Sequence, residues 1–314
     1  MTLDKNITAP LLDTALTSLH SDETSRRALE DLCAYLYQLR SEASPSQWAS
    51  IKESCRAHPL FDLILSEPIT QRAYGKPRGY AGDAKLMDLI YSVQTPAGLS
   101  SESERIHSFL KGRPCTFGAR ARKLKLAALL HRTLAEVEAP EILSVACGHM
   151  RETQLLSPER LGRAERLVAF DQDEASLGEV SRSLSDCDAL SVIPGSIRRL
   201  IAGEQDLGEF DLIYSLGLYD YLDQPVAKRL TQVLFDSLKP GGRLVIANYL
   251  PTEDSGFIEV FMEWNLIYRT PREILDLAGG VGAADVSSKR YGREHSGTIG
   301  FLELSKSDAV SIAA

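Results

Sequence analysis

Two short polar segments of the sequence combine residue types that suit the binding of a nucleoside. The turn from Ser144 to Glu152 (SVACGHMRE) contains the small residues Ala146, Cys147 and Gly148, around which backbone N–H groups can approach a ligand closely. Asp171 follows 23 residues after Gly148, and its carboxylate can accept hydrogen bonds from both hydroxyls of a ribose. The chain lacks the GxGxxG pattern that a pyrophosphate requires. We therefore expect a ligand with an adenosyl-type ribose and no pyrophosphate.

A second candidate for chemistry is the glycine- and proline-rich loop at residues 75–83 (GKPRGYAGD). Arg78 stands between a proline and a glycine, and a planar guanidinium held there could bind a carboxylate through two hydrogen bonds. Tyr80 and Asp83 could meet an ammonium group. The alternative is a linking loop whose arginine pairs with an acid at the surface. We favour contact with a substrate.

The predicted strands place the first of these segments at one edge of a sheet. From residue 141 the chain alternates helical stretches with apolar runs of about four to eight residues that end at turn residues. Strands separated by helices predict a parallel sheet covered by helices on both faces. Ligands of such sheets bind at the carboxyl ends of the strands. The expected strands are 141–146, 166–171, 190–195, 210–217 and 242–249, followed by a C-terminal pair at 284–292 and 298–306.

The first third of the chain is predicted to be helical. Apolar residues recur three and four apart from Leu11 to about Ile90, and no alternating strand pattern interrupts them. Asp83 is the expected N-cap of a helix at 84–92, and a basic amphipathic helix is expected at 119–137. The fold class is therefore α/β with an N-terminal all-helical domain. The predicted domains are 1–118, a helical domain or lid, and 119–314, the α/β domain.

Composition and charge describe an ordinary folded protein with no general affinity for nucleic acid. Of 314 residues, 44% are hydrophobic and 25% are charged, which is enough apolar material for a buried core. The formal net charge of -8 argues against a partner held through many phosphate contacts. A basic cluster around residue 120 is expected to be a solvated helix face. Its members are Arg113, Arg120, Arg122, Lys123 and Lys125.

The cysteines and the N-terminus predict a reducing compartment and no membrane span. The five cysteines are widely spaced and form no CxxC pair, so neither a disulfide framework nor a metal site is expected. No apolar signal segment is present, and no run approaches the roughly 18 apolar residues of a membrane helix. We expect a cytoplasmic protein with a small-molecule substrate and no nucleic-acid or membrane partner. A homodimer is an open alternative to a monomer.

The α/β part resembles the class I methyltransferases that use S-adenosylmethionine (SAM). Five features recur in the family's order: the turn ACGHMRE, the acid in AFDQDEASL, the turn PGSIRRL, the segment FDLIYSLGLYDYL and the stretch LKPGGRLVIANYLP. The resemblance covers residues 119–314 and implies a Rossmann-like, mostly parallel sheet with SAM as cofactor. Ser144 replaces the family's usual acid, and Ala146 and Met150 replace glycines. How the amino group of SAM is held is therefore an open question.

The resemblance assigns roles by position. It places the glycine turn at the methionine part of SAM, Asp171 at the ribose, the turn after the third strand at the adenine, and the turn after the fourth strand near the methyl group. Ser196 has an alternative role, because a serine after Pro-Gly can cap the next helix. The expected SAM-binding residues are Ala146, Cys147, Gly148, Asp171, Gln172, Ser196, Ile197, Ser215, Leu216 and Gly217.

The acceptor is expected near the ends of the fourth and fifth strands and the 75–83 loop. Methyl transfer from a sulfonium is an in-line displacement, so the enzyme mainly positions and desolvates the acceptor. An oxygen or nitrogen acceptor must also lose a proton, for which Asp220 is the candidate base, whereas a thioether needs no base. We expect positioning by Tyr219, Asn248 and Tyr249 without a catalytic base. The expected substrate-binding residues are Arg78, Tyr80, Asp83, Tyr219, Asn248 and Tyr249.

The helical N-terminal part, the PRGYAGDA loop and the NYLP tail resemble the bacterial methionine S-methyltransferases of dimethylsulfoniopropionate biosynthesis. This resemblance implies L-methionine as acceptor, S-methyl-L-methionine as product and Arg78 on the carboxylate of the acceptor. Relatives with the same loop include enzymes thought to act on fatty-acid carboxylates. The alternatives are an O- or N-methyltransferase of a small carboxylate, an amine or a fatty acid, and a SAM-binding regulator without activity.

Overall fold

The structure is a computed structural model, and it describes residues 8–308. The chain forms two compact units, and neither unit is one continuous stretch of the sequence. The chain passes from the first unit to the second within helix α8, returns to the first unit after strand β5, and then enters the second unit again. The units are 1–120 with 251–265, and 121–250 with 266–314.

The division into functional domains at 1–118 and 119–314 remains a prediction. The compact units differ from them chiefly in segment 251–265, which we expected in the second domain and which packs with the first unit. This segment contains a short helix with many apolar residues, and its burial with other helices removes that surface from water. The α/β part of the chain thus contributes to the core of the helical unit.

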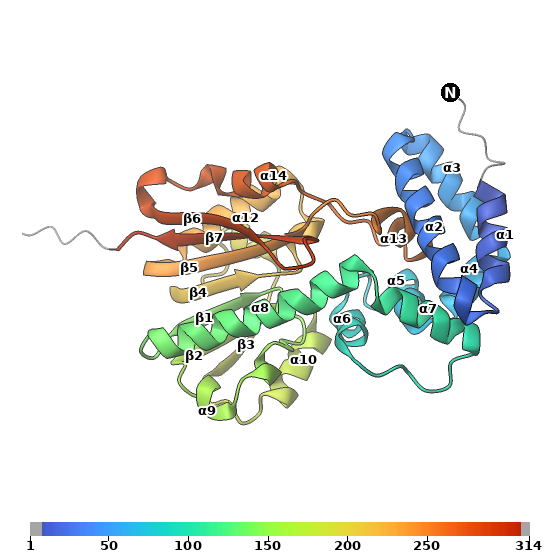
Figure 1. Cartoon of the computed structure of the whole chain (residues 1–314). Coiled ribbons are helices and arrows are strands. Elements are labelled where there is room, and N and C mark those ends of the chain that lie inside the picture. The colour runs from blue at the N-terminus through green and yellow to red at the C-terminus, as the bar shows by residue number, and fades with distance from the viewer. Residues whose placement is uncertain (1–7, 309–314) are drawn as a thin grey trace, which may run out of the picture. The chain divides into compact units, whose positions relative to one another are not determined.

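The first unit is built from helices with strong local start signals. Ser44 forms a capping box with Gln47, and Asp83 caps the helix after the glycine-rich loop by accepting the Leu86 amide at 2.8 Å. Several helices begin with a proline, whose missing N–H would have no helical partner in any case. The helices (Figure 1) are α1 (Thr8–Ser18), α2 (Asp22–Glu42), α3 (Pro45–Arg56), α4 (Pro59–Leu65), α5 (Pro68–Gly75), α6 (Ala84–Tyr91), α7 (Ser101–Lys111), α13 (Ser255–Phe261) and the first turns of α8 (Pro114–Glu136).

Helix α13 belongs to the core of the first unit although it follows the fifth strand in the sequence. It packs on α2, and a Cβ added to Gly256 would stand 2.5 Å from the backbone carbonyl carbon of Leu36. The buried Glu259 accepts hydrogen bonds from Arg40 Nε at 2.9 Å and from Trp48 Nε1 at 2.7 Å. Close packing and a buried charged hydrogen bond therefore fix α13 among the N-terminal helices.

The second unit is a seven-stranded sheet in the order β3-β2-β1-β4-β5-β7-β6. Strands β1 to β5 pair in parallel, and β7 runs antiparallel between β5 and β6. The strands are β1 (Glu141–Val145), β2 (Arg166–Asp171), β3 (Leu190–Pro194), β4 (Phe210–Ser215), β5 (Leu238–Tyr249), β6 (Val286–Arg293) and β7 (Ile299–Lys306). The helices, besides the rest of α8, are α9 (Pro158–Leu161), α10 (Glu174–Ser183), α11 (Ile197–Ile201), α12 (Gln224–Asp236) and α14 (Pro271–Asp276), with short 3₁₀ turns η2 (Thr153–Leu155), η3 (Tyr219–Tyr221), η4 (Leu277–Gly280) and η5 (Ala283–Asp285).

The sheet changes its direction of growth between β1 and β4. From β1 the chain adds β2 and β3 on one side, whereas β4 and β5 are added on the other. Connections that diverge at such a point leave a crevice at the carboxyl ends of the strands, where ligands bind. Ser144 and Tyr214 are partners in the parallel register of β1 and β4, so their side chains lie side by side on one face.

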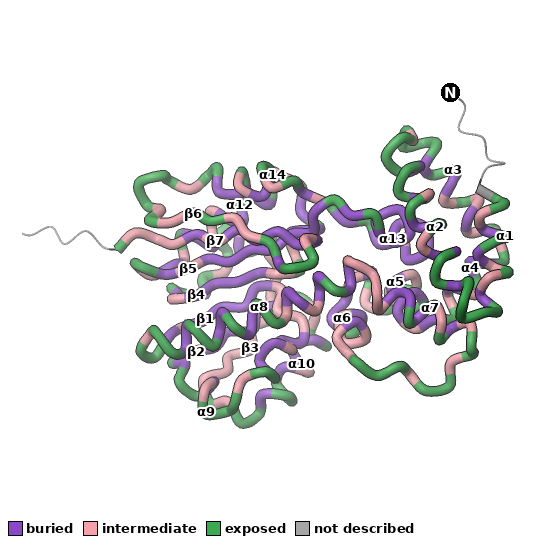
Figure 2. Tube along the Cα trace, viewed as in Figure 1, coloured by how far each residue is buried: buried purple, intermediate pink, exposed green. Residues whose placement is uncertain are grey.

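Alternating side chains of the strands face two different layers of helices. Leu143 of β1 and Ile246 of β5 join Leu230 of α12 in the main apolar cluster on one face. Helix α8 covers the other face (Figure 1), where the Lys125 ammonium lies 4.4 Å from the ring centroid of Phe301 in β7. Figure 2 shows the inner strands buried, while the edge strand β6 is partly exposed. The carboxyl edge is thus built on a rigid, covered sheet.

The structure confirms the predicted α/β architecture, including the mostly parallel sheet, the antiparallel C-terminal pair and the helical N-terminal region. Two details differ from the expectation. Helix α8 begins at Pro114 instead of residue 119, because proline suits the first helical position. The LKPGG stretch, expected as a turn before the fifth strand, lies inside β5 where its register with β4 shifts. Gly241 permits this irregularity with a φ of 74°.

The described part of the chain contains no candidate membrane helix, no metal-binding cluster and no disulfide. Within residues 8–308, no helix has the length and apolar character needed to cross a bilayer. The same residues include no group of three or more His, Cys, Asp or Glu side chains that could hold a metal ion. The five cysteines form no disulfide. Burial raises the pKa of the Cys55 thiol to about 12 and that of Cys147 well above its ordinary value, so neither is a nucleophile at neutral pH.

Candidate functional site

The turn after β1 has a left-handed backbone at alternate residues. Ala146, Gly148 and Met150 have φ angles of 52°, 56° and 47°. A residue with a Cβ is strained in this region by roughly 1–2 kcal/mol. The chain thus keeps a path that suits glycine at the two positions where it departs from the family's glycines. Strain of this kind persists where the surrounding structure enforces it, often at ligand sites.

Asp171 ties the turn after β1 to the end of β2. Its Oδ2 accepts the Gly148 amide at 2.9 Å, and its Oδ1 accepts the Asp173 amide at 2.9 Å. Burial raises the pKa of the Asp171 carboxyl, and these two backbone N–H groups act in the opposite direction. The carboxylate is therefore held in place beside the turn, where it can accept ribose hydroxyls. Gln172 follows it and is exposed.

The turn after β3 lies directly against β2. The Gly195 amide donates to the Asp171 carbonyl at 2.9 Å, and a Cβ on Gly195 would stand 2.5 Å from the Phe170 ring. Ser196 is the N-cap residue of α11, but its side chain makes no capping hydrogen bond. Helix capping therefore does not account for Ser196, which stays a predicted neighbour of the adenine. Ile197 packs against the main apolar cluster.

Ser215 ends β4 at the centre of the carboxyl edge. Its side chain is buried, and within residues 8–308 its hydroxyl has no hydrogen-bond partner. A buried hydroxyl without a partner is unfavourable, so an atom of a ligand is a natural partner for it. Leu216 and Gly217 follow, and the Leu216 carbonyl accepts a hydrogen bond from Arg122 Nη1. The three residues that we expected after β4 thus lie together at this edge.

Arg122 corrects the expectation of a solvated basic face. It is only 6% exposed, and its guanidinium carbon lies 5.8 Å from the ring centroid of Tyr249. Its bond to the Leu216 carbonyl places it at the carboxyl ends of β4 and β5. Arg113 is also not free in solvent, because it pairs with Asp254 at 2.6 Å. The spacing of basic residues along a helix shows which of them share a face, but it does not show whether that face meets solvent or the sheet.

Glu152 is a buried acid that sequence reasoning did not include in the site. Its Oε1 accepts the Tyr214 phenol at 3.0 Å, and Tyr214 is the register partner of Ser144. Burial raises the pKa of the Glu152 carboxyl, and the nearby Arg122 and Lys123 act in the opposite direction. Glu152 follows Gly148 by four residues, and the direction of its side chain is set only when the turn folds. The sequence therefore indicates only weakly that Glu152 belongs to the site.

Two residues that we expected to position the acceptor are held inside the fold. Tyr219 is fully buried, and its hydroxyl bonds to a threonine hydroxyl of α12 at 3.1 Å. Asn248 donates to a backbone carbonyl at 2.9 Å and accepts from Arg269 Nη1. Adjacent strand residues point to opposite faces, so Tyr249 faces Arg122 while Asn248 faces the other way. Structural contacts account for Tyr219 and Asn248, and Tyr249 stays in the proposed site.

Asp220 is a buried acid between the ends of β4 and β5. Its Oδ1 accepts the Tyr249 amide at 2.7 Å. Burial raises the pKa of Asp220 to about 6, and Arg122, the Tyr249 amide and Arg269 limit the rise. An acid of this strength is suited to proton transfer near neutral pH. Its bond to β5 gives it a structural role as well.

The 75–83 loop is anchored by an ion pair within the first unit. Asp83 is fully buried and accepts hydrogen bonds from Arg72 at 2.8 and 2.7 Å, in addition to capping α6. These contacts account for Asp83 without a substrate, so we leave it out of the proposed site. Arg78 and Tyr80 are partly buried, and both remain predicted substrate-binding residues.

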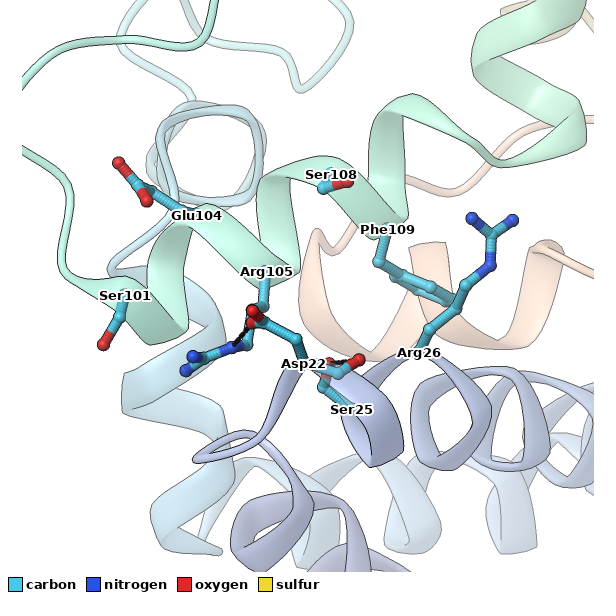
Figure 3. A pocket seen from close by; sticks show the side chains of 8 residues that line it. All are labelled: Asp22, Ser25, Arg26, Ser101, Glu104, Arg105, Ser108 and Phe109. Carbon is cyan, nitrogen blue, oxygen red and sulfur yellow. Dashed lines mark hydrogen bonds and ion pairs between the residues drawn. The ribbon is translucent and has the colours of Figure 1, made fainter.

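A separate hollow of about 390 Å³ lies in the first unit between α2 and α7 (Figure 3). Figure 3 shows Arg105 and Asp22 joined across it, and Phe109 forms part of its wall. Arg26, at its other end, pairs with Glu30 at 3.0 Å. Both arginines of the hollow are thus matched to carboxylates of the same unit, and we assign it no role in the chemistry.

The chain is similar in sequence to a methyltransferase domain and in fold to solved structures. Residues 142–242 match the methyltransferase domain family. No curated protein matches the chain. Among solved structures it is similar to a possible exported protein of Bordetella parapertussis, with 16% identity, a TM-score of 0.64 and coverage of 91% of this chain and 97% of that one. It is also similar to magnesium protoporphyrin IX methyltransferase of Synechocystis PCC 6803 (13% identity, TM-score 0.47, coverage 76% and 98%) and to N-methyltransferase NodS of Bradyrhizobium japonicum WM9 (17%, 0.43, 60% and 97%). The first of these likenesses shows a shared fold.

The matched segment runs from β1 into β5 and includes the glycine turn, Asp171 and Ser215. The seven-stranded sheet that carries it is the Rossmann-like methyltransferase fold. The protein is a SAM-dependent methyltransferase. Its residues fit SAM, since Asp171 presents a held carboxylate at the same edge as the buried hydroxyl of Ser215, which has no partner among the described residues. The contacts of individual residues with SAM stay a prediction.

Proposed function

We propose that the protein methylates a small molecule and that the acceptor atom is the thioether sulfur of L-methionine. The observation that carries this proposal is the state of the polar side chains after β4 and β5. Tyr219 and Asn248 are bound within the fold, and the Asp220 carboxyl accepts the Tyr249 amide. A thioether has no proton to lose, so it suits a site whose polar side chains already form hydrogen bonds within the fold. The resemblance of the PRGYAGDA loop supports methionine in particular.

In this proposal the residues of the chain act by holding, orienting and excluding water. The glycine turn, Asp171 and Ser215 hold SAM, which supplies an activated methyl group when bound. Tyr249 is buried and presents its ring to the same face as Arg122, which keeps this edge dry. Arg78 binds the carboxylate of the acceptor, for which its planar fork is well matched. Orientation and desolvation are then the whole contribution of the protein to the rate.

One observation favours an alternative acceptor. Burial raises the pKa of Asp220 to about 6, which is the range of a general base that works near neutral pH. An amine, a hydroxyl or a fatty-acid carboxyl could then be the methylated group, with Asp220 accepting a proton from an amine or a hydroxyl. The two proposals differ in pH dependence, because only an acceptor that loses a proton to Asp220 links the rate of chemistry to its ionisation.

The decisive experiment is product identification from a panel of acceptors. The purified protein is incubated with methyl-labelled SAM and separate sets of amino acids, hydroxy acids, amines and fatty acids, and the labelled product is identified by mass spectrometry. We expect label in S-methyl-L-methionine. Label in an ester or an N-methyl product would support the alternative. SAM binding without turnover of any acceptor would indicate a regulator.

The role of Arg78 is tested by replacing it with lysine. Arg78→Lys keeps the charge but loses the two-pronged hydrogen bond, so kcat/KM for methionine should fall by at least about tenfold, or about 1.4 kcal/mol. The affinity for SAM, measured by calorimetry, should stay unchanged. Arg26→Lys, at another paired arginine of the first unit, is the matched control and should behave as the wild type. Native kinetics in Arg78→Lys would remove Arg78 from the acceptor site.

We also propose a cytoplasmic location. All five cysteines are free thiols, and two of them lie fully buried in the first unit, where oxidation would disrupt packing. Free thiols are the usual state of cysteine in reducing compartments. Fractionation of the native host with an antibody against the protein would test the location.

A further inference from the structure

We propose that Glu152 and Arg122 recognise the amino-acid end of SAM, with Glu152 taking the ammonium group and Arg122 the carboxylate. The inference rests on the proposal that SAM lies on the glycine turn. It answers a question that the sequence raised, since Ser144 stands where the family usually has an acid. The acid is supplied from a different position of the same turn.

The register between β1 and β4 brings a tyrosine next to Ser144. Ser144 and Tyr214 are paired in the sheet, so the phenol stands next to the position of the missing acid. The Tyr214 hydroxyl donates to Glu152 Oε1 at 3.0 Å. Tyr214 therefore fixes the Glu152 carboxylate beside Ser144, at the carboxyl edge of the sheet. Through Tyr214, the Glu152 carboxylate thus stands close to Ser144, the position at which the family usually has an acid.

The order of the strands sets the order of the polar groups along the carboxyl edge. The strands are ordered β2-β1-β4, and Asp171 at the end of β2 accepts the Gly148 amide of the turn after β1. Glu152 is joined to β4 through Tyr214, the residue before Ser215, whose buried hydroxyl has no hydrogen-bond partner within residues 8–308. A ligand with its ribose on Asp171 thus extends its other end toward β4, where Glu152 and Ser215 are found.

Buried charges of both signs lie at the end of β4. Glu152 is 8% exposed, and its carboxylate has more acceptor capacity than the single phenol uses. Arg122 and Lys123 already oppose the rise that burial causes in the pKa of Glu152, and the ammonium group of an amino acid adds a further positive charge that can donate hydrogen bonds to the carboxylate. Arg122 is equally buried, and its bond to the Leu216 carbonyl places it directly after Ser215. An acid and an arginine on one face are complementary to a zwitterion, and a guanidinium is the group best matched to its carboxylate.

The experiment compares ligands that differ only in the amino-acid end. Binding is measured by calorimetry with S-adenosylhomocysteine, with decarboxylated SAM and with 5′-methylthioadenosine, which has no amino-acid end. Glu152→Gln should weaken S-adenosylhomocysteine at least tenfold and leave 5′-methylthioadenosine unchanged. Arg122→Gln should weaken S-adenosylhomocysteine at least tenfold and leave decarboxylated SAM unchanged. Glu179→Gln is the control. Glu179 lies on the neighbouring α10 and pairs with Arg151, and the variant should bind all three ligands as the wild type does.

Circular dichroism checks the fold of each variant, and Tyr214→Phe serves as a second variant if Glu152→Gln fails to fold. Loss of the phenol should weaken S-adenosylhomocysteine severalfold without affecting 5′-methylthioadenosine. Unchanged binding of S-adenosylhomocysteine by folded Glu152→Gln and Arg122→Gln would overturn this inference alone. An equal loss for 5′-methylthioadenosine would overturn it too, because the residues would then act on the fold. A wild-type protein that binds none of the three ligands would overturn the SAM site itself, and this inference with it.

Discussion

Burial changes the acidity of single residues in the site, and Asp220 is the clearest case. Asp220 is 2% exposed, and burial raises its pKa to about 6, although Arg122 and a backbone N–H act in the opposite direction. In the unfolded chain an aspartate has a pKa of about 3.9. Folding therefore favours the protonated form of this residue, and the stability of the fold depends on its ionisation.

Asp220→Asn tests this dependence. The contribution of Asp220 to stability is fully present below about pH 3.9 and is lost as the pH rises through about 6, because the ionised carboxylate is poorly solvated in the fold. Asparagine keeps the acceptor for the Tyr249 amide and cannot ionise. The free energy of unfolding of the variant, minus that of the wild type, should thus increase between pH 4 and pH 7, by as much as about 3 kcal/mol.

The measurement is denaturant unfolding of both proteins at several pH values. Asp223→Asn is a suitable control, since Asp223 is exposed, caps α12 and has an equally good cap in asparagine. Its difference from the wild type should not vary with pH. A difference for Asp220→Asn that is flat from pH 4 to pH 7 would show that Asp220 is not a buried acid with a raised pKa.

At the scale of elements, the turn after β1 is the piece of backbone on which the site depends. Its left-handed residues turn the Gly148 amide toward Asp171, and this links the ends of β1 and β2. Two of these residues carry a Cβ and are strained. The rest of the sheet must hold the turn in this shape, because the local sequence does not favour it.

Ala146→Gly should relieve part of this strain. We expect the free energy of unfolding to rise by about 0.5–1 kcal/mol, because glycine adopts a φ of 52° without a clash and this outweighs its larger backbone entropy. The affinity for SAM should not fall. Ala128→Gly, at an exposed position of helix α8, is the matched control and should lower stability by about 1 kcal/mol. If both variants lose stability equally in denaturant unfolding, the turn is not strained.

In the molecule as a whole, the helical unit includes a segment that lies between two parts of the second unit in the sequence. The helical unit takes segment 251–265 from the α/β part, and the buried side chains of Phe257 and Phe261 belong to its core. The two ends of this segment are close together in the second unit, because the Arg269 amide donates to the Tyr249 carbonyl at 3.0 Å. The segment is thus an excursion from one point of the sheet edge.

This topology predicts how the chain can be divided. A chain that begins at residue 119 and keeps 251–265 should aggregate, because Phe257 and Phe261 lose their cover, and each contributes about 2–3 kcal/mol when buried. The same chain with 251–265 replaced by a short Gly-Ser turn should be soluble and bind S-adenosylhomocysteine. Size-exclusion chromatography and thermal unfolding distinguish the two. Equal behaviour of both chains would show that the segment does not depend on the N-terminal helices.

Features of the fold that depend on local pattern could be predicted from the sequence. Strands were predictable because apolar runs bounded by turn residues specify them, and the helical first third because its apolar spacing has the period of a helix. The glycine turn and Asp171 were predictable because each directly follows such a run. The same local reasoning identified Asp83 as a helix cap, and its side chain accepts the Leu86 amide.

The contacts between distant side chains could not be predicted, because they form only in the folded chain. Glu152 meets Tyr214 because β1 and β4 are neighbours, although their residues are far apart in the sequence. Arg122 is at the sheet edge and not in solvent because α8 lies on the sheet. Tyr219 and Asn248 are held by contacts within the fold, because Arg269 donates to the Tyr219 carbonyl and to the Asn248 side chain. Contacts of this kind depend on strand order and on the face that each residue presents, which local periodicity does not encode.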